Sequence, residues 1–524
     1  MRIFRLIISK LINNKNKFFL VFLFLFSIGI NQYYANRGVF PLDSFHFFDS
    51  GFRILNGEIP FSDYWLVKGP FLDYSTALFF LLFGVSWQSY VLQASLLNSI
   101  ITISTFFVFK GFNLKISYCF LYALLLSILA YPSSGTPFID HHSAFFSLLG
   151  IYSLIYAMKD NKKFYWLLAP ILFGISFLSK QVPGAYIILL SIFVLLIYSS
   201  INKKFYFIKY CFIGSSIFFI FFISLGFQQQ ISFISFIDQY ILYPQTIGRG
   251  RIEGLNLSFN SIVSNYKFIY LVFIPMFYIN CEKIIFDRKY FKNIDFYVFL
   301  LLIFFTISLI FHQLLTKNQI FIFFLIPLLA GFSHISLNNS ELKYKKIISS
   351  FLIIICLLTT FKYHLRFNVE RKFHELRNAN FQMSEDAKKI HKKFFGLKWI
   401  TPEYLKNPKE EIDLINRAKK IMKSDKRSKM VITNYHFFSF LLNEKLSAPS
   451  RVYTFDGTTH PLKDSKYSTH YQNLIDTLII KNNVEVIYFV NVGGDFHYID
   501  SYKHCFQKNL LHEKLISYDL KKCL

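Results

Sequence analysis

Residues 18–30 read FFLVFLFLFSIGI, and residues 31–70 continue NQYYANRGVFPLDSFHFFDSGFRILNGEIPFSDYWLVKGP. The first stretch is a continuous apolar run of the kind that inserts into a lipid bilayer. The second is a long connection that carries both acidic and basic side chains. Connections in compact proteins usually have about 4–6 residues, and longer ones tend to be functional. The pair of stretches therefore predicts a membrane protein with a site for a charged group at the membrane surface.

Similar apolar runs recur along the chain, for example over Ile347–Phe361. The 524 residues are 53% hydrophobic and include 67 Phe and 33 Tyr, far more than a soluble core of this size needs. Repeated runs of near-bilayer length are typical of a polytopic helical membrane protein. We expect an all-α membrane domain to make up most of the chain.

The net charge of +26 would suggest a nucleic-acid partner in a soluble protein. Here most basic residues lie in short clusters between apolar runs, which is the positive-inside pattern of membrane proteins. The charge therefore reports topology, and no nucleic-acid partner is expected. The clusters are Lys15/Lys17, Lys110/Lys115, Lys159/Lys162/Lys163, Lys203/Lys204, Lys283/Arg288/Lys289/Lys292 and Lys343/Lys345/Lys346.

The clusters also predict which segments cross the membrane. Arg2, Arg5, Lys10, Lys15 and Lys17 place the N-terminus in the cytoplasm, and alternation then gives about eleven spans with the C-terminus outside. The run 71–84 is too short to cross easily and is expected to be interfacial or half-inserted. Long outer loops are expected at 31–70 and 228–265. The predicted spans are 18–36, 88–109, 116–134, 141–158, 164–178, 185–198, 207–227, 266–281, 295–311, 319–337 and 347–362.

The composition changes after Lys362, and residues 363–524 are rich in charge. Helix-like segments at 410–423 and 471–480 alternate there with strand-like segments at 429–433 and 485–492, an order typical of an α/β domain. The sequence therefore predicts a transmembrane domain over 1–362 and a small extracytoplasmic α/β domain over 363–524, with a lead-in over 363–408. Cys505 and Cys523 could pair in an oxidising compartment, although spacing alone does not show it.

Two carboxylates follow predicted spans on the outer face. Asp43, in FPLDS, could act as a general base that takes a proton from an acceptor hydroxyl or amine. Asp140, in GTPFIDHHS, lies on the same predicted face and could share a cavity with it. The structural alternative for each is a helix N-cap, a position that Asp favours. His141 and His142 could contact substrate or a metal ion.

Several cations are predicted on the same face. Lys68, in WLVKGP, could snorkel to the interface or bind phosphate. Lys180 lies between two apolar runs, where an unpaired ammonium is costly, so it needs a carboxylate or a phosphate as partner. Arg249 and Arg251, in GRGRIEG, suit bidentate phosphate binding on adaptable backbone or form a solvated turn. Lys317 has the same two interpretations. Carboxylates and cations on one face suit a lipid-linked sugar.

These residues and their order resemble the GT-C glycosyltransferases that use polyprenyl-phosphate donors, a group that includes protein O-mannosyltransferases and the lipid A aminoarabinose transferase. The resemblance covers residues 1 to about 362 and does not extend to the C-terminal region. The matching pieces are Asp43, GEIPFSDY (57–64), KGP (68–70), LLFGVS (81–86), Asp140, LSK (178–180), and Lys317 before IPL (326–328).

The resemblance implies an inverting sugar transfer in which Asp43 is the catalytic base and Lys68 contacts the donor phosphate. Asp140 would position groups or contact a divalent cation; no cofactor is certain. The partners would be the lipid-linked donor, membrane lipid, and an envelope glycan, lipid or protein acceptor. The place would be the inner (plasma) membrane. Two departures put the acceptor in question: Asp43 is followed by Ser44 where many relatives have an acidic pair, and Gly69 separates Lys68 from Pro70.

Two other functions use similar features. A transporter or flippase of lipid-linked sugars would place charges near the midplane and often contains inverted repeats. The sequence has no convincing repeat, and the charged residues of the candidate site lie mostly in predicted outer loops. An oligosaccharide polymerase or ligase would also act on lipid-linked sugars at the outer face.

Overall fold

The computed structural model describes residues 15–131, 135–317, 322–451, 453–454, 456–492, 496–520 and 523. The predicted N-terminal cations Arg2, Arg5 and Lys10 lie outside these residues, as do 132–134 and 319–321 of two predicted spans. The chain folds into two compact units. Unit 1 contains residues 1–35, 94–221 and 254–373, and unit 2 contains residues 36–93, 222–253 and 374–524.

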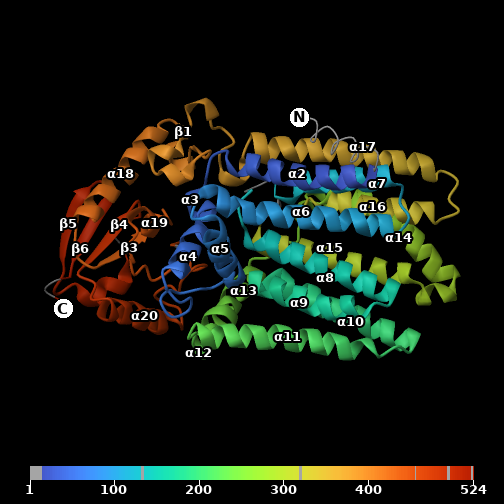
Figure 1. Ribbon diagram of the computed structural model, residues 1–524, viewed down its shortest axis with the longest axis horizontal. Helices are drawn as coiled ribbons and strands as arrows, with labels where there is room; N and C mark the ends of the chain where they lie inside the picture. Colours follow the sequence, from blue (N-terminus) through green and yellow to red (C-terminus); the bar gives the residue numbers. More distant parts are fainter. Residues whose placement is uncertain are drawn as a thin grey trace, which may run out of the picture. The chain divides into compact units, whose positions relative to one another are not determined.

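Unit 1 is a bundle of long helices that run side by side (Figure 1). Its sequence is apolar on nearly every face of these helices, as a membrane bundle requires. Two further helices, α6 (Trp87–Gly111) and α11 (Phe207–Gln228), include residues of both units. The helices of unit 1 are α2 (Lys15–Ala35), α7 (Ile116–Ala130), α8 (Ile139–Asp160), α9 (Lys163–Ser179), α10 (Gln181–Asn202), α14 (Lys267–Phe286), α15 (Ile294–Thr316), α16 (Leu325–Asn338) and α17 (Lys345–His364).

Among the described residues, seven helices are long and apolar enough to cross a membrane. They are α2, α6, α10, α11, α14, α15 and the helical stretch that begins with α17. The helices α7, α9 and α16 are apolar but shorter, as is α5 (Pro70–Phe83), the segment expected to be half-inserted. A helix therefore lies at each predicted span. The prediction of a polytopic helical membrane protein is confirmed, whereas the count of about eleven crossings stays a prediction.

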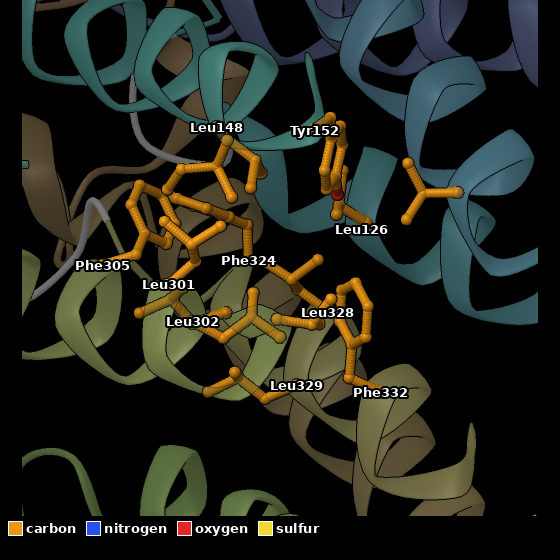
Figure 2. Close-up of a cluster of buried hydrophobic side chains, with 14 of the residues drawn as sticks. Leu126, Leu148, Tyr152, Leu301, Leu302, Phe305, Phe324, Leu328, Leu329 and Phe332 are labelled. Atoms are coloured by element: carbon orange, nitrogen blue, oxygen red, sulfur yellow. The ribbon is translucent and has the colours of Figure 1, made fainter. Parts of the chain in front are cut away.

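The core of unit 1 joins helices that are distant in the sequence. Leu148 and Tyr152 of α8 lie close to Leu301 of α15 and Leu328 of α16, with Phe324 between them (Figure 2). All five side chains are at least 97% buried. Leu and Phe in close contact provide the dispersion that holds membrane helices together, since lipid is as apolar as the helices themselves.

Unit 2 contains a four-stranded mixed sheet with the order β3-β4-β6-β5, beside which α18 and α20 lie (Figure 1). The β3–β4 pair is parallel and the other two pairs are antiparallel. The predicted helices and strands of an α/β domain are confirmed at all four segments. The elements are α3 (Pro41–Ser44), α4 (His46–Leu55), α5, α12 (Phe233–Phe236), α13 (Tyr243–Glu253), β1 (Glu385–Asp386), β2 (Lys398–Trp399), α18 (Pro408–Ser424), β3 (Lys429–Thr433), α19 (Phe438–Leu442), α20 (Ser468–Lys481), β4 (Val486–Val490), β5 (Gln507–His512) and β6 (Leu515–Asp519).

The two segments expected as long outer loops contain helices. Residues 41–55 form α3 and α4, and residues 233–253 form α12, a π-helical turn (Ile237–Leu242) and α13. Both segments belong mostly to unit 2, together with the C-terminal region, so the units cut across the predicted division at residue 362. The lead-in 363–408 contains short 3₁₀ turns and the small β1–β2 ladder.

Cys505 and Cys523 form a disulfide, with their Cα atoms 5.1 Å apart. The bond ties the start of β5 to the chain that follows β6. It is one of the two outcomes that the sequence left open.

Candidate functional site

A cluster of three ionisable side chains lies within unit 1. The Lys180 ammonium and His312 Nε2 both lie 2.7 Å from Oδ1 of Asp140, and Lys180 Nζ is 3.2 Å from His312 Nε2. The side chains of Asp140, Lys180 and His312 are only 7%, 13% and 3% exposed. A buried carboxylate is stable only when it is paired with a cation and hydrogen-bonded. Here Lys180 supplies the positive charge, and Lys180 and His312 both lie within hydrogen-bond distance of the Asp140 carboxylate.

Helix ends position the three residues. Asp140 lies in the first turn of α8, where the helix dipole favours a negative charge. Lys180 is the extended residue between α9 and α10, with φ −159° and ψ 132°. Its N–H donates to Ser176 O at 3.1 Å, and its carbonyl accepts from Ser143 Oγ at 3.3 Å. This break in the helix pair turns the lysine toward α8.

The partner of Lys180 in the structure is a carboxylate, which is one of the two partners that the sequence allowed. His312, near the end of α15, was missed by the sequence reasoning, which considered Lys317 five residues later. The available signal was a lone histidine in an otherwise apolar span, because ionisable groups at membrane depth are costly and tend to be functional.

Asp140 does not cap its helix. Phe138 is the N-cap residue of α8, so the structural alternative considered for Asp140 is wrong. His141 and His142 are both buried beside it. His142 Nδ1 lies 3.1 Å from the Tyr131 hydroxyl. Within the described residues, no group of three or more His, Cys, Asp or Glu side chains is arranged to hold a metal ion.

Asp43 lies in the short helix α3 of unit 2 and is half-buried. Phe40 is the N-cap of α3 and Phe45 that of α4, so Asp43 is not an N-cap either. The Ser44 hydroxyl accepts the Phe40 N–H at 3.1 Å and so supplies the local capping contact. The carboxylate of Asp43 is therefore not needed to begin a helix.

Lys68 lines a pocket in unit 2 with Arg451 and His46. Gly69 follows with φ +76°, a left-handed conformation that glycine adopts without strain, and Pro70 is the first residue of α5. The glycine between Lys68 and Pro70 thus lets the chain turn into the helix. Burial, reinforced by Arg451 and Lys68, holds the pKa of His46 well below its usual range, so this imidazole is neutral at pH 7.

Arg451 anchors the segment that carries Lys68. Its guanidinium forms an ion pair with Asp73 and donates a hydrogen bond to the Lys68 carbonyl. Nearby, the Trp65 N–H donates to Pro449 O at 2.8 Å. The arginine is 4% exposed and lies almost four hundred residues after its partners, so no local sequence pattern indicates this role.

The remaining predicted cations lie on α13 and at the end of α15. Arg249 is exposed and Arg251 half-buried on α13, and neither forms an ion pair within the described part of the chain. The expectation that these arginines lie in a loop or turn is wrong, because residues 248–251 are part of helix α13. Lys317 is exposed and ends α15 with φ +52°. The structure therefore brings Asp140 and Lys180 together in unit 1, and gives Lys68 its own basic pocket in unit 2.

Residues 67–225 match the family described as dolichyl-phosphate-mannose-protein mannosyltransferase. No curated protein sequence matches the chain. A crystal structure of ArnT from Cupriavidus metallidurans bound to undecaprenyl phosphate has the same fold, with 11% identity, a TM-score of 0.51, and coverage of 96% of this chain and 97% of that one. The apo ArnT structure also matches at 11% identity and a TM-score of 0.51, over 95% and 97% of the two chains. The family match covers residues 67–225 alone, and the likeness to the two ArnT structures is a likeness of fold.

Proposed function

We propose that the protein transfers a sugar from a polyprenyl-phosphate donor to an extracytoplasmic acceptor at the inner (plasma) membrane. The observation that carries the proposal is the buried Asp140–Lys180–His312 cluster, because a transferase needs fixed charge at membrane depth to handle an anionic lipid head group. The names of the matched family and of the ArnT complex, which contain dolichyl phosphate and undecaprenyl phosphate, support a donor of this class.

In the proposed reaction, Asp43 accepts the proton of the acceptor hydroxyl or amine. The freed oxygen or nitrogen attacks the anomeric carbon from the face opposite the leaving group, so the configuration inverts. The bond from that carbon to the phosphate oxygen breaks, and polyprenyl phosphate departs with the electron pair. A phosphate leaves as a weak base, so no general acid is required, in contrast to glycosidases.

Five cations are the proposed phosphate contacts: Lys68, Lys180, Arg249, Arg251 and Lys317. A cation that contacts the leaving phosphate stabilises the negative charge that grows on it, an effect that is strongest away from bulk water. Lys68 and Lys180 have the strongest support, since one lines a basic pocket and the other is buried. Asp140 would position Lys180 and His312.

The experiment begins with a deletion strain, because the acceptor is unknown. Mass spectrometry of its envelope lipids, glycans and proteins should reveal a species that lacks one sugar residue. Plasmid-borne wild-type protein should restore that species, whereas Asp43→Asn should not, although it should be expressed and bind undecaprenyl phosphate normally. Asp464→Asn, an exposed carboxylate of unit 2, is the matched control and should restore it fully.

If Asp43→Asn restores the missing sugar-bearing species, Asp43 is not the catalytic base. Accumulation of a fully sugared lipid donor on the cytoplasmic side, with no species lacking a sugar, would instead favour a flippase. Loss of a whole polymer chain would favour a polymerase or ligase.

A further inference from the structure

A cavity of about 260 Å³ lies in unit 1. Asp140, Lys180 and His312 are not among the residues that line it. A single water occupies about 30 Å³, so the cavity has room for a larger polar group. It lies where α14 begins and α17 ends. Its lining residues are Ser264, Asn265, Lys267, Phe268, Phe323, Lys362, Tyr363, Arg366 and Phe367.

Three of the lining side chains are cations: Lys267, Lys362 and Arg366. Within the described residues, none of them forms an ion pair with a carboxylate. The Nε of Arg366 is buried without a hydrogen-bond partner. A buried guanidinium N–H without an acceptor is unfavourable, and cations gathered without counter-charge repel one another. The cavity therefore has the chemistry of an anion site.

The membrane topology rule does not account for these cations. The opposite ends of the same two helices already carry basic residues, Lys283 on α14 and Lys345 and Lys346 on α17. Lys283 and Lys345 donate to the carbonyls of Asn339 and Ser340, so those ends lie together. A helix of 20 residues is about 30 Å long, which separates the two ends by the thickness of a bilayer core. Because the positive-inside rule needs basic residues at only one end of a membrane helix, it does not explain why Lys267, Lys362 and Arg366 lie at the other end.

Aromatic rings form the apolar side of the cavity. The rings of Phe323 and Tyr363 stack with their centroids 3.8 Å apart, and Tyr363 and Phe367 are parallel at 5.9 Å. Lys362 Nζ lies 5.0 Å from the centre of the Phe268 ring. Stacked rings beside cations at the end of a membrane helix suit an amphipathic ligand, with an anionic head group above and acyl chains beside it.

We propose that this cavity binds the phosphate head group of an anionic membrane lipid. Arg366 and Lys362 would donate charge-assisted hydrogen bonds to the phosphate oxygens, and Lys267 would add a third positive charge. Basic pockets between membrane helices recognise lipid head groups in this manner. The site does not depend on the proposed sugar transfer, because its ligand is lipid of the surrounding bilayer.

Native mass spectrometry of the detergent-purified chain tests the proposal, with phosphatidylglycerol as the anionic probe and phosphatidylcholine as the zwitterionic one. The variant Lys362→Gln/Arg366→Gln should bind phosphatidylglycerol about tenfold more weakly, the loss expected when charge-assisted hydrogen bonds are removed. Its binding of phosphatidylcholine should not change. Lys283→Gln/Lys346→Gln removes the same charge at the opposite helix ends and should bind phosphatidylglycerol as the wild type does.

Lys362 is exposed, so Lys362→Gln alone should fold normally and should show part of the loss even if the double variant is unstable. Unchanged binding of phosphatidylglycerol by Lys362→Gln and by the double variant would overturn the proposal. Millimolar inorganic phosphate provides the second arm. Displacement of the lipid by phosphate alone, together with a thermal shift that the double variant loses, would assign the cavity to a soluble phosphate instead.

Discussion

At the residue scale, the central feature is the buried ion pair between Lys180 and Asp140. Lys180→Met would leave Asp140 charged and short of its main partner, and breaking such a buried pair costs about 3–5 kcal/mol. We expect the purified variant to unfold at a clearly lower temperature in detergent and to bind undecaprenyl phosphate more weakly.

The double variant Asp140→Asn/Lys180→Met is the control, since it removes both charges. It should recover much of the lost stability, because an uncharged buried pair carries no unpaired ion. Recovery of stability without recovery of undecaprenyl phosphate binding would assign Lys180 to the donor. Normal binding by Lys180→Met would make the lysine purely structural.

A second residue, Glu411 of α18, predicts a pH dependence. Its carboxylate accepts hydrogen bonds from Trp399, Thr401 and Tyr435 at 2.7–2.9 Å. Burial nevertheless raises the pKa of Glu411 from 4.5 to about 7. The folded state then holds a proton that the unfolded state has lost, so stability is highest below pH 4.5 and falls as pH rises toward about 7.

Thermal unfolding measured from pH 4.5 to pH 7 should therefore show this decline in the wild type. Glu411→Gln does not titrate, and its curve should be flatter over the same range. Parallel curves for the two proteins would contradict the raised pKa.

Sequence reasoning at this scale indicated that Lys180 needs an anionic partner, which the structure shows to be Asp140, but it did not find groups whose partners are remote in the sequence. Asp140 and Lys180 stand out because each interrupts an apolar stretch, where charge is expensive. The partners of His312 and Arg451, Asp140 and Asp73, lie more than a hundred residues away in the sequence. Local sequence patterns do not predict such long-range contacts.

At the scale of elements, apolar length and strand patterning predicted helices and strands to within a few residues, as for β3 at Lys429–Thr433. The two long connections were predicted less well. Their helices α4 and α13 are short and rich in aromatic and charged residues, and tertiary contacts decide their structure more than local propensity does.

Those contacts give the C-terminal region a role: it holds the connection that carries Lys68. Arg451→Met would leave Asp73 buried without its guanidinium, at a cost of about 3–5 kcal/mol. We expect residues 61–69 to loosen, and limited proteolysis of the full chain should cut there. The loss would also weaken undecaprenyl phosphate binding if Lys68 contacts the donor.

Arg427→Met is the matched control for that experiment. Arg427, between α18 and β3, pairs with Asp425 and with Asp519 of β6, but its side chain is 33% exposed, and such pairs contribute about 0–1 kcal/mol. Arg427→Met should therefore not expose residues 61–69 to the protease. If Arg451→Met is cleaved in this segment no faster than Arg427→Met, Arg451 does not hold the segment in place.

At the scale of the whole molecule, charge clusters predicted a topology, and the disulfide adds an independent argument for it. Cys505 and Cys523 pair, and disulfides persist in oxidising compartments outside the cytoplasm. The alternation of basic clusters and the redox chemistry both predict that the C-terminal region lies outside the cytoplasm.

A pair of reporter fusions tests this prediction. Alkaline phosphatase, which is active only outside the cytoplasm, should be active after Leu524, and green fluorescent protein at the same point should stay dark. A fusion after Lys204, between α10 and α11, should give the opposite result, since the cluster there is predicted to be cytoplasmic. In the same cells, a thiol reagent should label Cys505 and Cys523 only after reduction. Fluorescence at the C-terminus with freely labelled cysteines would reverse the orientation, and with it the side of the membrane on which Asp43 would meet its acceptor.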